Sequence, residues 1–463
     1  MSVLRVAAGL MAAVAMADAS TGFPGAKIGD GFMHVPVKRD GRVVETNVSN
    51  QIELYSIEIE IGYPPQKTIV SIDTGSSELW VNPNCSSVPT SFGQRARCEK
   101  VPLFNVSESS SVEGPGGSQT ISYGSLGEEL TAVRMDMYED TVVVGDAELR
   151  SQRLGVSTEV KGLPMGIMGL APSMSGWAIN ETYPLFLDNM SLQKMINSRA
   201  YSIGLGPMGN STGSLIFGGI DAKKFTGTLA KQHIVKSTDG KARLTIEYES
   251  LSISSKDIGS KTFNVADKNV LIDTGNTFSK LEASLVKELW NVTGAKLSES
   301  IGWPLVDCKI RKLPGGLTFG FTGTEVTVSF SDLIYEVDNT CVFGILPVED
   351  GGQQILGATF LRSAYAVFDL DNKNIHLAQY EDCGSDVITI GSGESAVPRL
   401  KGGCSDYFNS TTTTTATANP SATGTSSLAA ATPVHAGTGS IMGASPVAAV
   451  IAIAALMGLA DGV

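Results

Sequence analysis

Histidines, basic clusters and paired cysteine motifs are scarce in this chain. The four histidines lack the spacing of metal ligands, which argues against a zinc site and a Ser-His-Asp triad. Lys and Arg number 34 against 47 Asp and Glu, and the net charge of −13 argues against a nucleic-acid partner. No Cys-x-x-Cys occurs, so a thioredoxin-like or cysteine-based metal site is not expected.

Charged residues make up only 17% of the 463 residues, whereas hydrophobic residues make up 42%. Such a chain can bury two or three cores and is not wholly disordered. Alternating and β-branched runs bounded by turn residues predict strands, while helical patterns are few and short. We expect strands over 54–61, 69–72, 141–144 and 326–330, and helices over 182–197 and 283–291. The sequence therefore predicts a mainly β protein.

The N-terminal segment is typical of a secretory signal peptide over 1–19. Arg5 precedes an apolar run over 6–16, and Ala17-Asp18-Ala19 forms a small-x-small cleavage site. The alternative is a buried N-terminal helix. Residues 20–39 end in Lys38-Arg39, a dibasic pair that predicts processing of a propeptide; an exposed basic pair without processing is the alternative.

The C-terminal end predicts a stalk and a lipid anchor. Residues 405–445 are rich in Ser, Thr, Ala, Gly and Pro, a composition with little to bury. The apolar run over 447–460 is shorter than the ~20 residues that a membrane-spanning helix needs. This order predicts a GPI-attachment signal with Gly437 as the attachment site, although Ala436, Gly439 and Ser440 compete. A short single-pass helix or a flexible tail remains the alternative.

Six cysteines and several glycosylation motifs agree with a secretory route. Six cysteines allow fifteen connectivities, and proximity in sequence favours Cys85–Cys98, Cys308–Cys341 and Cys383–Cys404. Asn84 lies in Asn-Cys-Ser, a poorer acceptor motif. The predicted N-glycosylation sites are Asn47, Asn105, Asn180, Asn189, Asn210, Asn291 and Asn409.

The tripeptide Asp-Thr-Gly occurs twice, each time after an apolar strand, over 70–75 and over 270–275. Each copy is followed downstream by an apolar-apolar-Gly segment, over 166–171 and 354–358. Chance would produce one Asp-Thr-Gly in fewer than about one chain in ten at average residue frequencies. The doubled arrangement in the same order is therefore a specific signal.

The duplication suits peptide hydrolysis by water. Two strand-end turns brought face to face by a pseudo-two-fold axis would place Asp73 and Asp273 within hydrogen-bonding distance, and Gly75 and Gly275 would allow the close fold. Carboxylates that close share one proton. The ionised member can take a proton from water while the protonated member polarises the scissile carbonyl, so neither a metal nor another cofactor is required. Each Asp taken alone could instead cap its strand as an Asx turn.

With these motifs in this order and spacing, the chain resembles the pepsin-like aspartic proteases, and in particular their fungal GPI-anchored yapsin-like branch. The resemblance covers about residues 50–382, and its clearest motifs are Asp-Thr-Gly-Ser-Ser-x-Leu-Trp over 73–80 and Ile-Ser-Tyr-Gly-Ser over 121–125. It implies a bilobal fold with pseudo-two-fold symmetry and a cleft between the lobes. It also implies a flap formed by Tyr123 and Gly124, with Tyr123 hydrogen-bonded to the indole of Trp80.

The resemblance further implies roles for the residues beside the two aspartates. Thr74 and Thr274 would lock the two loops together, and Ser76 and Asn276 would donate to the carboxylates. Cys308–Cys341 matches the C-lobe disulfide of the family. Asn276 departs from the family pattern, which has Ser or Thr at this position. We expect retained activity with an altered pH optimum; an inactive enzyme is the alternative.

These observations predict an organisation and a function. After the signal peptide and the propeptide, we expect an N-terminal lobe over 40–225, a C-terminal lobe over 226–390, a stalk over 391–445 and a GPI signal over 446–463. We expect a monomeric aspartic endopeptidase that acts on peptides or proteins at acidic pH, anchored at the cell surface. A catalytically weak or inactive surface binding protein is one alternative, and a cell-wall structural glycoprotein is another.

Overall fold

The computed structural model describes residues 42–404 apart from short gaps at 51–53, 89–93, 125–130, 174–175, 178–182, 209–211, 238, 300–301, 338 and 349–350. The predicted signal peptide, propeptide and GPI signal lie outside these residues, as do Gly437, Asn180, Asn210 and Asn409. Within the described part of the chain, no helix is long and apolar enough to cross a membrane.

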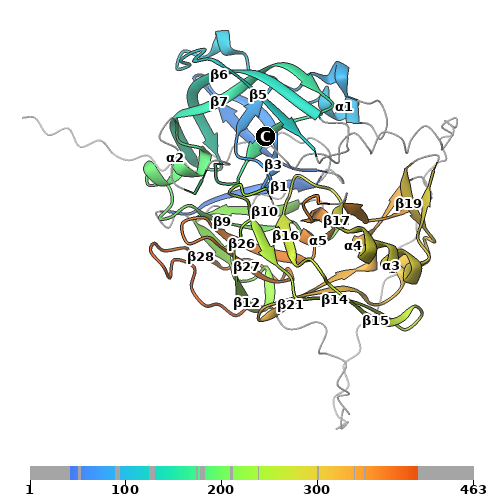
Figure 1. Cartoon of the computed structure of the whole chain (residues 1–463). Helices are drawn as coiled ribbons and strands as arrows, with labels where there is room; N and C mark the ends of the chain where they lie inside the picture. Colours follow the sequence, from blue (N-terminus) through green and yellow to red (C-terminus); the bar gives the residue numbers. More distant parts are fainter. Residues whose placement is uncertain are drawn as a thin grey trace, which may run out of the picture.

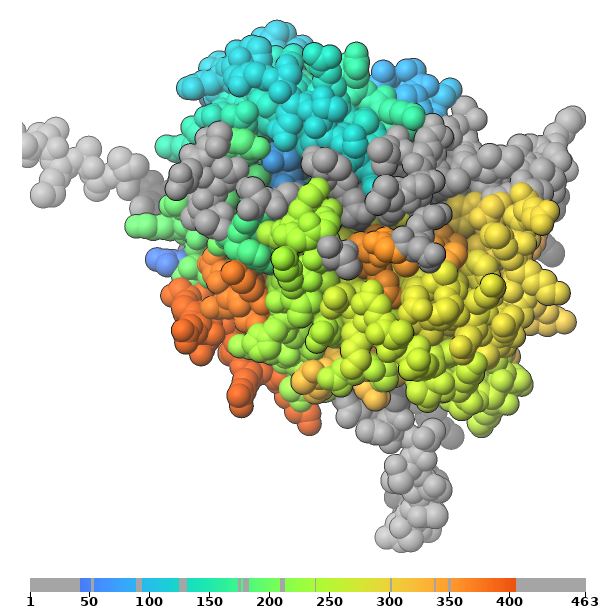
Figure 2. Space-filling view, in the orientation of Figure 1, coloured from blue at the N-terminus to red at the C-terminus, as the bar shows by residue number. Residues whose placement is uncertain are grey.

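Two β-rich halves make up the molecule, as predicted. Figure 1 shows blue-to-green residues in one half and yellow-to-orange residues in the other, and Figure 2 shows the same two masses in a space-filling view. One sheet, with 13 strands among the described residues, builds the first half and continues across the contact into the second half. In spatial order these are β12 (Phe225–His233), β27 (Asn374–Tyr380), β26 (Ala364–Asp369), β9 (Ala200–Gly204), β10 (Thr212–Phe217), β1 (Val44–Asn50), β2 (Tyr55–Ile61), β3 (Gln66–Asp73), β8 (Gly166–Gly169), β4 (Leu79–Val81), β7 (Ala147–Lys161), β6 (Thr131–Val144) and β5 (Ser118–Tyr123).

The six strands from β12 to β1 bring strands from the beginning and the end of the described chain into one layer. Each neighbouring pair among them is antiparallel, and β9 from the first half pairs directly with β26 from the second. Strands contributed by both halves therefore lie in one continuous layer, which fixes the position of one half relative to the other. Buried apolar side chains run through both halves as one large cluster.

The second half is built mainly from three smaller sheets. Strands β13, β16, β25, β17 and β24 form the one that reaches the centre of the molecule. Its strands are, in spatial order, β13 (Thr245–Glu247), β16 (Asn269–Ile272), β25 (Ile355–Leu356), β17 (Ser279–Glu282) and β24 (Ile345–Val348). The second of the three sheets consists of β15 (Gly259–Phe263), β14 (Ser250–Ser255), β20 (Gly316–Phe321) and β21 (Thr324–Ser329). The third consists of β18 (Lys296–Ser298), β19 (Trp303–Val306), β23 (Thr340–Phe343) and β22 (Ile334–Val337). A separate pair joins β11 (Gly219–Asp221) to β28 (Val387–Thr389).

The helices are short and lie around the sheets. Helix α3 (Ala283–Thr293) buries Leu285, Val286 and Leu289 on one face and ends at Gly294, whose φ of 72° is the left-handed conformation that glycine adopts at helix ends. The other helices are α1 (Gln94–Cys98), α2 (Phe186–Leu192), α4 (Phe330–Leu333) and α5 (Ala358–Leu361), with 3₁₀ turns η1 (Cys85–Ser87), η3 (Val106–Glu108) and η4 (Ile310–Lys312).

Helix α2 is shorter than the predicted 182–197. It begins after Pro184, where the Asp188 carboxylate accepts a hydrogen bond from the backbone N–H of Leu185 at 3.0 Å. Beyond its end, Lys194 adopts a φ of 62°, which a continuing helix cannot accommodate. Local capping and one left-handed residue thus override the longer apolar pattern.

The folded body extends past the predicted lobe boundary at residue 390, so the prediction of a stalk from 391 was wrong. Ala396 and Val397 are buried, and the Leu229 N–H donates to the Leu400 carbonyl at 3.0 Å. Gly402 and Gly403 also donate backbone hydrogen bonds to the body, and a disulfide joins Cys383 to Cys404. Residues 391–404 belong to the second half because their polar backbone is paired with it.

Candidate active site

Parallel strand pairs place the two Asp-Thr-Gly loops in the same way in the two halves. Strand β3 ends at Asp73 and pairs in parallel with β8, while β16 ends just before Asp273 and pairs in parallel with β25. Each strand is fully buried in its last three residues, so each loop starts inside the core. The glycine-containing segments predicted as partners, over 166–171 and 354–358, supply β8 and β25.

The threonines of the two loops form a reciprocal set of hydrogen bonds. The Thr74 hydroxyl donates to the Ile272 carbonyl at 2.8 Å and accepts from the Thr274 N–H at 3.0 Å. The Thr274 hydroxyl donates to the Ile72 carbonyl at 2.9 Å and accepts from the Thr74 N–H at 3.0 Å. These four bonds hold residues 200 positions apart against one another, as the resemblance implied for this pair.

The glycines bring each loop against the carboxyl group of the other. A Cβ at Gly75 would lie 2.7 Å from Oδ2 of Asp273, and one at Gly275 would lie 2.5 Å from Oδ1 of Asp73. The Gly75 and Gly275 N–H groups each donate at 2.8 Å to Oδ1 of the aspartate two residues earlier. No side chain larger than hydrogen fits at either position without displacing a carboxyl group.

Asp73 and Asp273 are buried and face each other, because a Cβ at Gly275 would lie 2.5 Å from Oδ1 of Asp73 and 3.2 Å from Oδ1 of Asp273. Removal from water raises the pKa of both carboxyl groups, and the charge of Asp73 further raises the pKa of Asp273. The pair therefore keeps one proton to a higher pH than separate carboxyl groups would, and it titrates as a unit. A carboxylate and a carboxylic acid side by side can act as base and acid.

A side chain from the fourth position of each loop reaches the remaining carboxyl oxygen. The Ser76 hydroxyl donates to Oδ2 of Asp73, and the Asn276 amide donates to Oδ2 of Asp273 at 2.7 Å. Both residues are buried. Sequence reasoning placed a donor at each of these positions.

Tyr123 and Trp80 lie beside this pair. The Trp80 indole N–H donates to the Tyr123 hydroxyl at 2.9 Å, and both side chains are fully buried. Tyr123 ends β5, and Gly124 follows with a φ of 124°, a conformation that glycine adopts freely. Burial and then the charge of Asp73 raise the pKa of Tyr123, so its hydroxyl stays neutral near the two aspartates.

The two buried carboxyl groups on matched Asp-Thr-Gly loops lie within the part of the chain that matches a known protein family. The model of the eukaryotic aspartyl protease family matches residues 54–380. The chain belongs to this family.

Named relatives agree with this assignment. The protease is 31% identical over 355 residues to candidapepsin of Candida tropicalis, covering 75% of this chain and 84% of the relative. It is 29% identical over 347 residues to secreted aspartic protease 8 of Candida albicans, covering 74% and 80%. It is 30% identical over 382 residues to the "Probable aspartic-type endopeptidase opsB" of Aspergillus oryzae, covering 78% and 76%.

The fold is shared with the aspartic proteinase from Irpex lacteus. The TM-score is 0.58 at 20% identity, and the match covers 73% of this chain and 98% of that structure. The mainly β, bilobal pepsin-like fold predicted from the sequence is thereby confirmed.

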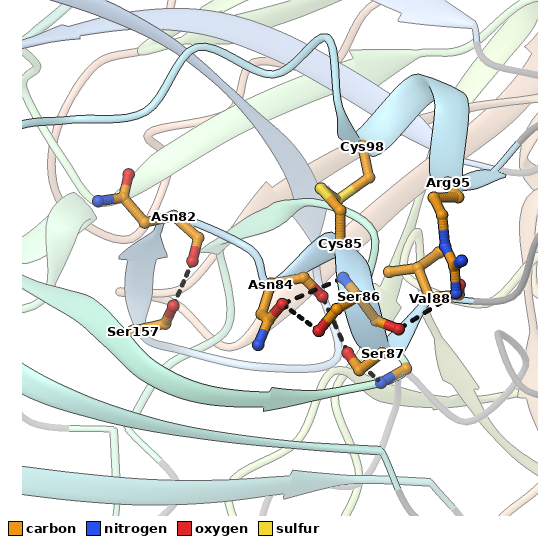
Figure 3. Close-up of a disulfide and its surroundings, with 10 residues drawn as sticks. Asn82, Asn84, Cys85, Ser86, Ser87, Val88, Arg95, Cys98 and Ser157 are labelled. Carbon is orange, nitrogen blue, oxygen red and sulfur yellow. Dashed lines mark hydrogen bonds between the residues drawn. A yellow bond between two sulfur atoms is a disulfide. The ribbon is translucent and has the colours of Figure 1, made fainter.

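The predicted disulfides are all present: Cys85–Cys98, Cys308–Cys341 and Cys383–Cys404. Figure 3 shows the first, which closes a loop directly after β4. Arg95 of this loop donates to the Val88 carbonyl from Nε at 2.9 Å and from Nη2 at 2.7 Å (Figure 3). This arginine therefore stabilises the loop itself.

The sequence motifs for glycosylation fall in different environments. Asn105 and Asn291 are exposed, and Asn47 is half-buried. Asn189 is buried, and its amide nitrogen donates to Oε1 of Gln152 at 3.1 Å. The prediction of a glycan on Asn189 is therefore wrong for the folded protease, because the nitrogen that would carry the sugar is enclosed and engaged.

Glu78 is a residue near the site that sequence reasoning left unassigned. Its carboxylate accepts from the Tyr183 hydroxyl at 2.9 Å, and the guanidinium of Arg153 lies 4.2 Å from the centre of the Tyr183 ring. Burial raises the pKa of Glu78. Its charge also acts on Tyr123. An acidic residue inside the first motif was the available signal, but its partner is 105 positions away.

Arg362 is the second residue whose place the sequence did not reveal. It is fully buried and donates from Nε to the Tyr55 hydroxyl at 2.7 Å, joining residues 307 positions apart. The ring of Tyr335 lies 4.7 Å from its guanidinium carbon. A delocalised cation between two aromatic rings links β2 of the first half to the chain after α5 in the second.

Proposed function

We propose that this protease hydrolyses peptide bonds with a water molecule held between Asp73 and Asp273. The observation that carries the proposal is the close approach of the two buried carboxyl groups on loops held by the reciprocal threonine bonds. A Cβ at Gly275 would lie 2.5 Å from Oδ1 of Asp73 and 3.2 Å from Oδ1 of Asp273. Candidapepsin and the other named relatives are described as endopeptidases or aspartic proteases, which supports the same reaction here.

The chemistry follows from the shared proton. The ionised carboxylate removes a proton from water while the water oxygen bonds to the carbonyl carbon of the substrate. The protonated carboxyl gives its proton to the carbonyl oxygen. The tetrahedral diol then breaks down: the proton taken from water passes to the leaving amine nitrogen, the C–N bond breaks, and one diol hydroxyl returns its proton to the carboxylate that had given one to the carbonyl oxygen. Neither carboxyl group forms a covalent bond to the substrate, and the pair ends with the one proton with which it began.

The substrate would be an extended peptide bound in a cleft between lobes 40–225 and 226–390. Tyr123 and Gly124 would form a flap over it, and the Trp80 hydrogen bond supports this role because it fixes the direction of the Tyr123 hydroxyl. Main-chain hydrogen bonding to an extended strand tolerates many sequences, and pockets for side chains would add preference.

Acidic pH would suit this enzyme. Burial raises the pKa of both aspartates, so the shared proton is retained through the acidic range and is lost as the pH rises past the upper pKa of the pair. Activity should therefore fall on the alkaline side. It should also fall at very low pH, where the second carboxylate becomes protonated and no base remains.

The test of the catalytic proposal is a peptide-cleavage assay at acidic pH, with and without pepstatin. Wild-type protein should cleave, pepstatin should inhibit it, and Asp73→Asn should lose at least about a thousandfold of the rate, since one of two cooperating groups is gone. Asp257→Asn is the matched control, because Asp257 is an exposed aspartate in a surface turn. Equal cleavage by wild type and Asp73→Asn, or cleavage that pepstatin leaves unchanged, would show that the aspartate pair is not its source and would favour a surface binding protein without catalysis.

We further propose that the protease acts as a monomer at the cell surface. The similarity to a secreted aspartic protease supports an extracellular location. A signal peptide over 1–19, a propeptide over 20–39 and a GPI-attachment signal over 446–463 would deliver, silence and anchor it, as in the yapsin-like branch. Treatment of intact cells with phosphatidylinositol-specific phospholipase C should release the protein; retention on the cells would argue for another attachment.

A further inference from the structure

The two Asp-Thr-Gly loops differ at one position that touches the carboxyl groups. The backbone carbonyl at this fourth position is held alike in both: Ser76 O accepts from the Ala171 N–H at 3.0 Å, and Asn276 O accepts from the Ala358 N–H at 2.8 Å. The side chains at these matched places are a hydroxyl in one loop and an amide in the other. Because the two backbones are held alike, the hydroxyl of Ser76 and the amide of Asn276 can be compared as two functional groups at equivalent positions.

The hydroxyl and the amide differ in what they can do for a carboxyl oxygen. A serine hydroxyl donates to an ionised oxygen and, by turning its hydrogen away, accepts from a protonated one. The NH2 of an asparagine only donates. Oδ2 of Asp73 can therefore be ionised or protonated without losing its bond to Ser76. Oδ2 of Asp273 accepts strongly from Asn276 only while it is ionised; once protonated it is a much weaker acceptor, and the NH2 cannot accept its hydrogen in return.

The amide of Asn276 has little freedom to change this. The residue is 1% exposed and its amide nitrogen donates to Oδ2 of Asp273 at 2.7 Å, so the side chain is enclosed and engaged. Its side-chain oxygen is buried without a hydrogen-bond partner among the described residues. The orientation with NH2 toward Asp273 is thus retained although it leaves this oxygen unpaired.

We propose that Asn276 is a positioning residue that reserves Oδ2 of Asp273 as a proton acceptor and so divides the roles of the two aspartates. In the resting enzyme the shared proton lies between the carboxyl groups. During attack Oδ2 of Asp73 passes this proton to the substrate carbonyl, and the oxygen, once ionised, accepts from the Ser76 hydroxyl. Asp273 takes the proton of the attacking water and passes it to the leaving nitrogen, which restores the bond from Asn276. This inference rests on the proposed proteolytic function.

Among the described residues, few other groups near the pair could produce the same bias. Tyr123 from β5 and Tyr201 from β9 face Asp73, and burial raises the pKa of both, so they stay neutral in acid. Tyr335 donates from its hydroxyl to the Thr277 carbonyl at 3.2 Å and is likewise neutral, because burial raises its pKa. The charge of Glu78, in the first loop, raises the pKa of Tyr123. Helix α5, which packs on the second loop, has no ionisable side chain.

The test is the pH profile of kcat/KM for exchanges at the two positions. Asn276→Ser allows Oδ2 of Asp273 to hold a proton, so the acid-side apparent pKa should rise by roughly half a unit to one unit. Ser76→Asn places a donor-only amide on both aspartates and should lower this pKa and reduce kcat. The exchange Ser76→Asn/Asn276→Ser should return the acid limb toward its wild-type position.

An Asn276→Ser enzyme that is folded and active, with the same acid-side apparent pKa of kcat/KM as wild type, would overturn the inference and leave the proposed function intact. Where a variant cleaves too slowly, the pH dependence of pepstatin binding, measured by calorimetry, gives the same comparison. There too an unmoved acid-side pKa in Asn276→Ser counts against the inference. An inactive wild type, by contrast, would reject the proposed function itself.

Discussion

The first and second Asp-Thr-Gly loops are alike at the carboxyl groups and differ with distance from them. Their threonines, glycines and backbone contacts correspond atom for atom. The sixth position is Glu78 in the first loop and Phe278 in the second. The reaction requires symmetry only where the two acids meet, and the rest of each loop serves its own half.

The outer parts of the loops have different surroundings. In the first half, Trp80 is hydrogen-bonded to Tyr123 and Glu78 to Tyr183, so polar contacts lead from the loop to the end of β5 and to the segment before α2. In the second half, the Phe278 ring lies edge-on to Trp303 at 5.0 Å and to Tyr335 at 4.7 Å. The first loop thus connects the site to the residues that we propose as the flap, and the second fixes the site to a packed aromatic cluster.

The largest effect of this difference is expected at the sixth position. Phe278→Ala would leave a cavity between Trp303 and Tyr335 and should lower the free energy of unfolding by about 3–5 kcal/mol. Glu78→Ala removes one hydrogen bond at a half-buried place and should cost about 1 kcal/mol. Urea unfolding of both variants makes the comparison. Equal losses would show that the second loop is no better anchored than the first.

The glycines test the symmetric part. Gly75→Ala and Gly275→Ala each push a Cβ into the carboxyl group of the opposite loop, and each should lower kcat/KM by at least about a hundredfold. The control is Gly116→Ala, where the nearest atom to a new Cβ is 3.9 Å away. If only one of the two loop variants loses activity, the close approach matters on one side alone.

The threonines test whether the two loops support each other equally. Thr74→Val removes the acceptor of the Thr274 N–H and the donor to Ile272, and should destabilise the protein by about 2 kcal/mol. Thr274→Val should cost the same. Because the bonds form one network, the double variant should lose less than the sum of the two. Additive losses in urea unfolding would contradict the reciprocal arrangement.

Local sequence was sufficient for the strands and the loops but not for the pairing of distant strands. The alternating run over 54–61 appears as β2, and the β-branched run over 141–144 lies in β6. Nothing local shows that β9 pairs with β26, because backbone hydrogen bonds between strands carry no side-chain code. The end of the body at Cys404 was missed for a related reason, since residues 391–404 have no periodic apolar pattern and are held by backbone bonds and a disulfide.

The candidate site could be predicted as far as the duplicated motif reached. The two aspartates, the threonine pair, both donors and the Trp80–Tyr123 pair were named from motifs, and the structure brings all of them together. Arg362 and Glu78 were not assigned roles, because their partners Tyr55 and Tyr183 lie far away in sequence. Asn105 and Asn189 lie in the same kind of glycosylation motif, and the sequence alone does not show that one is exposed and the other buried.

The smallest expected effect concerns the charge of Glu78, which the second loop lacks. Burial raises its pKa above the ordinary value, so the folded protease binds a proton more tightly here than the unfolded chain does. The stability this contributes is fully present below the unfolded pKa and is lost as the pH rises through the folded pKa. Glu78→Gln should therefore match wild type in acid and become the more stable of the two above that range, when thermal midpoints are measured from acid to neutral pH. Phe278→Leu, which changes no titratable group, should alter the midpoint by the same amount at every pH. A stability difference between Glu78→Gln and wild type that does not change with pH would show that the Glu78 carboxyl keeps its ordinary pKa despite its burial against Tyr183.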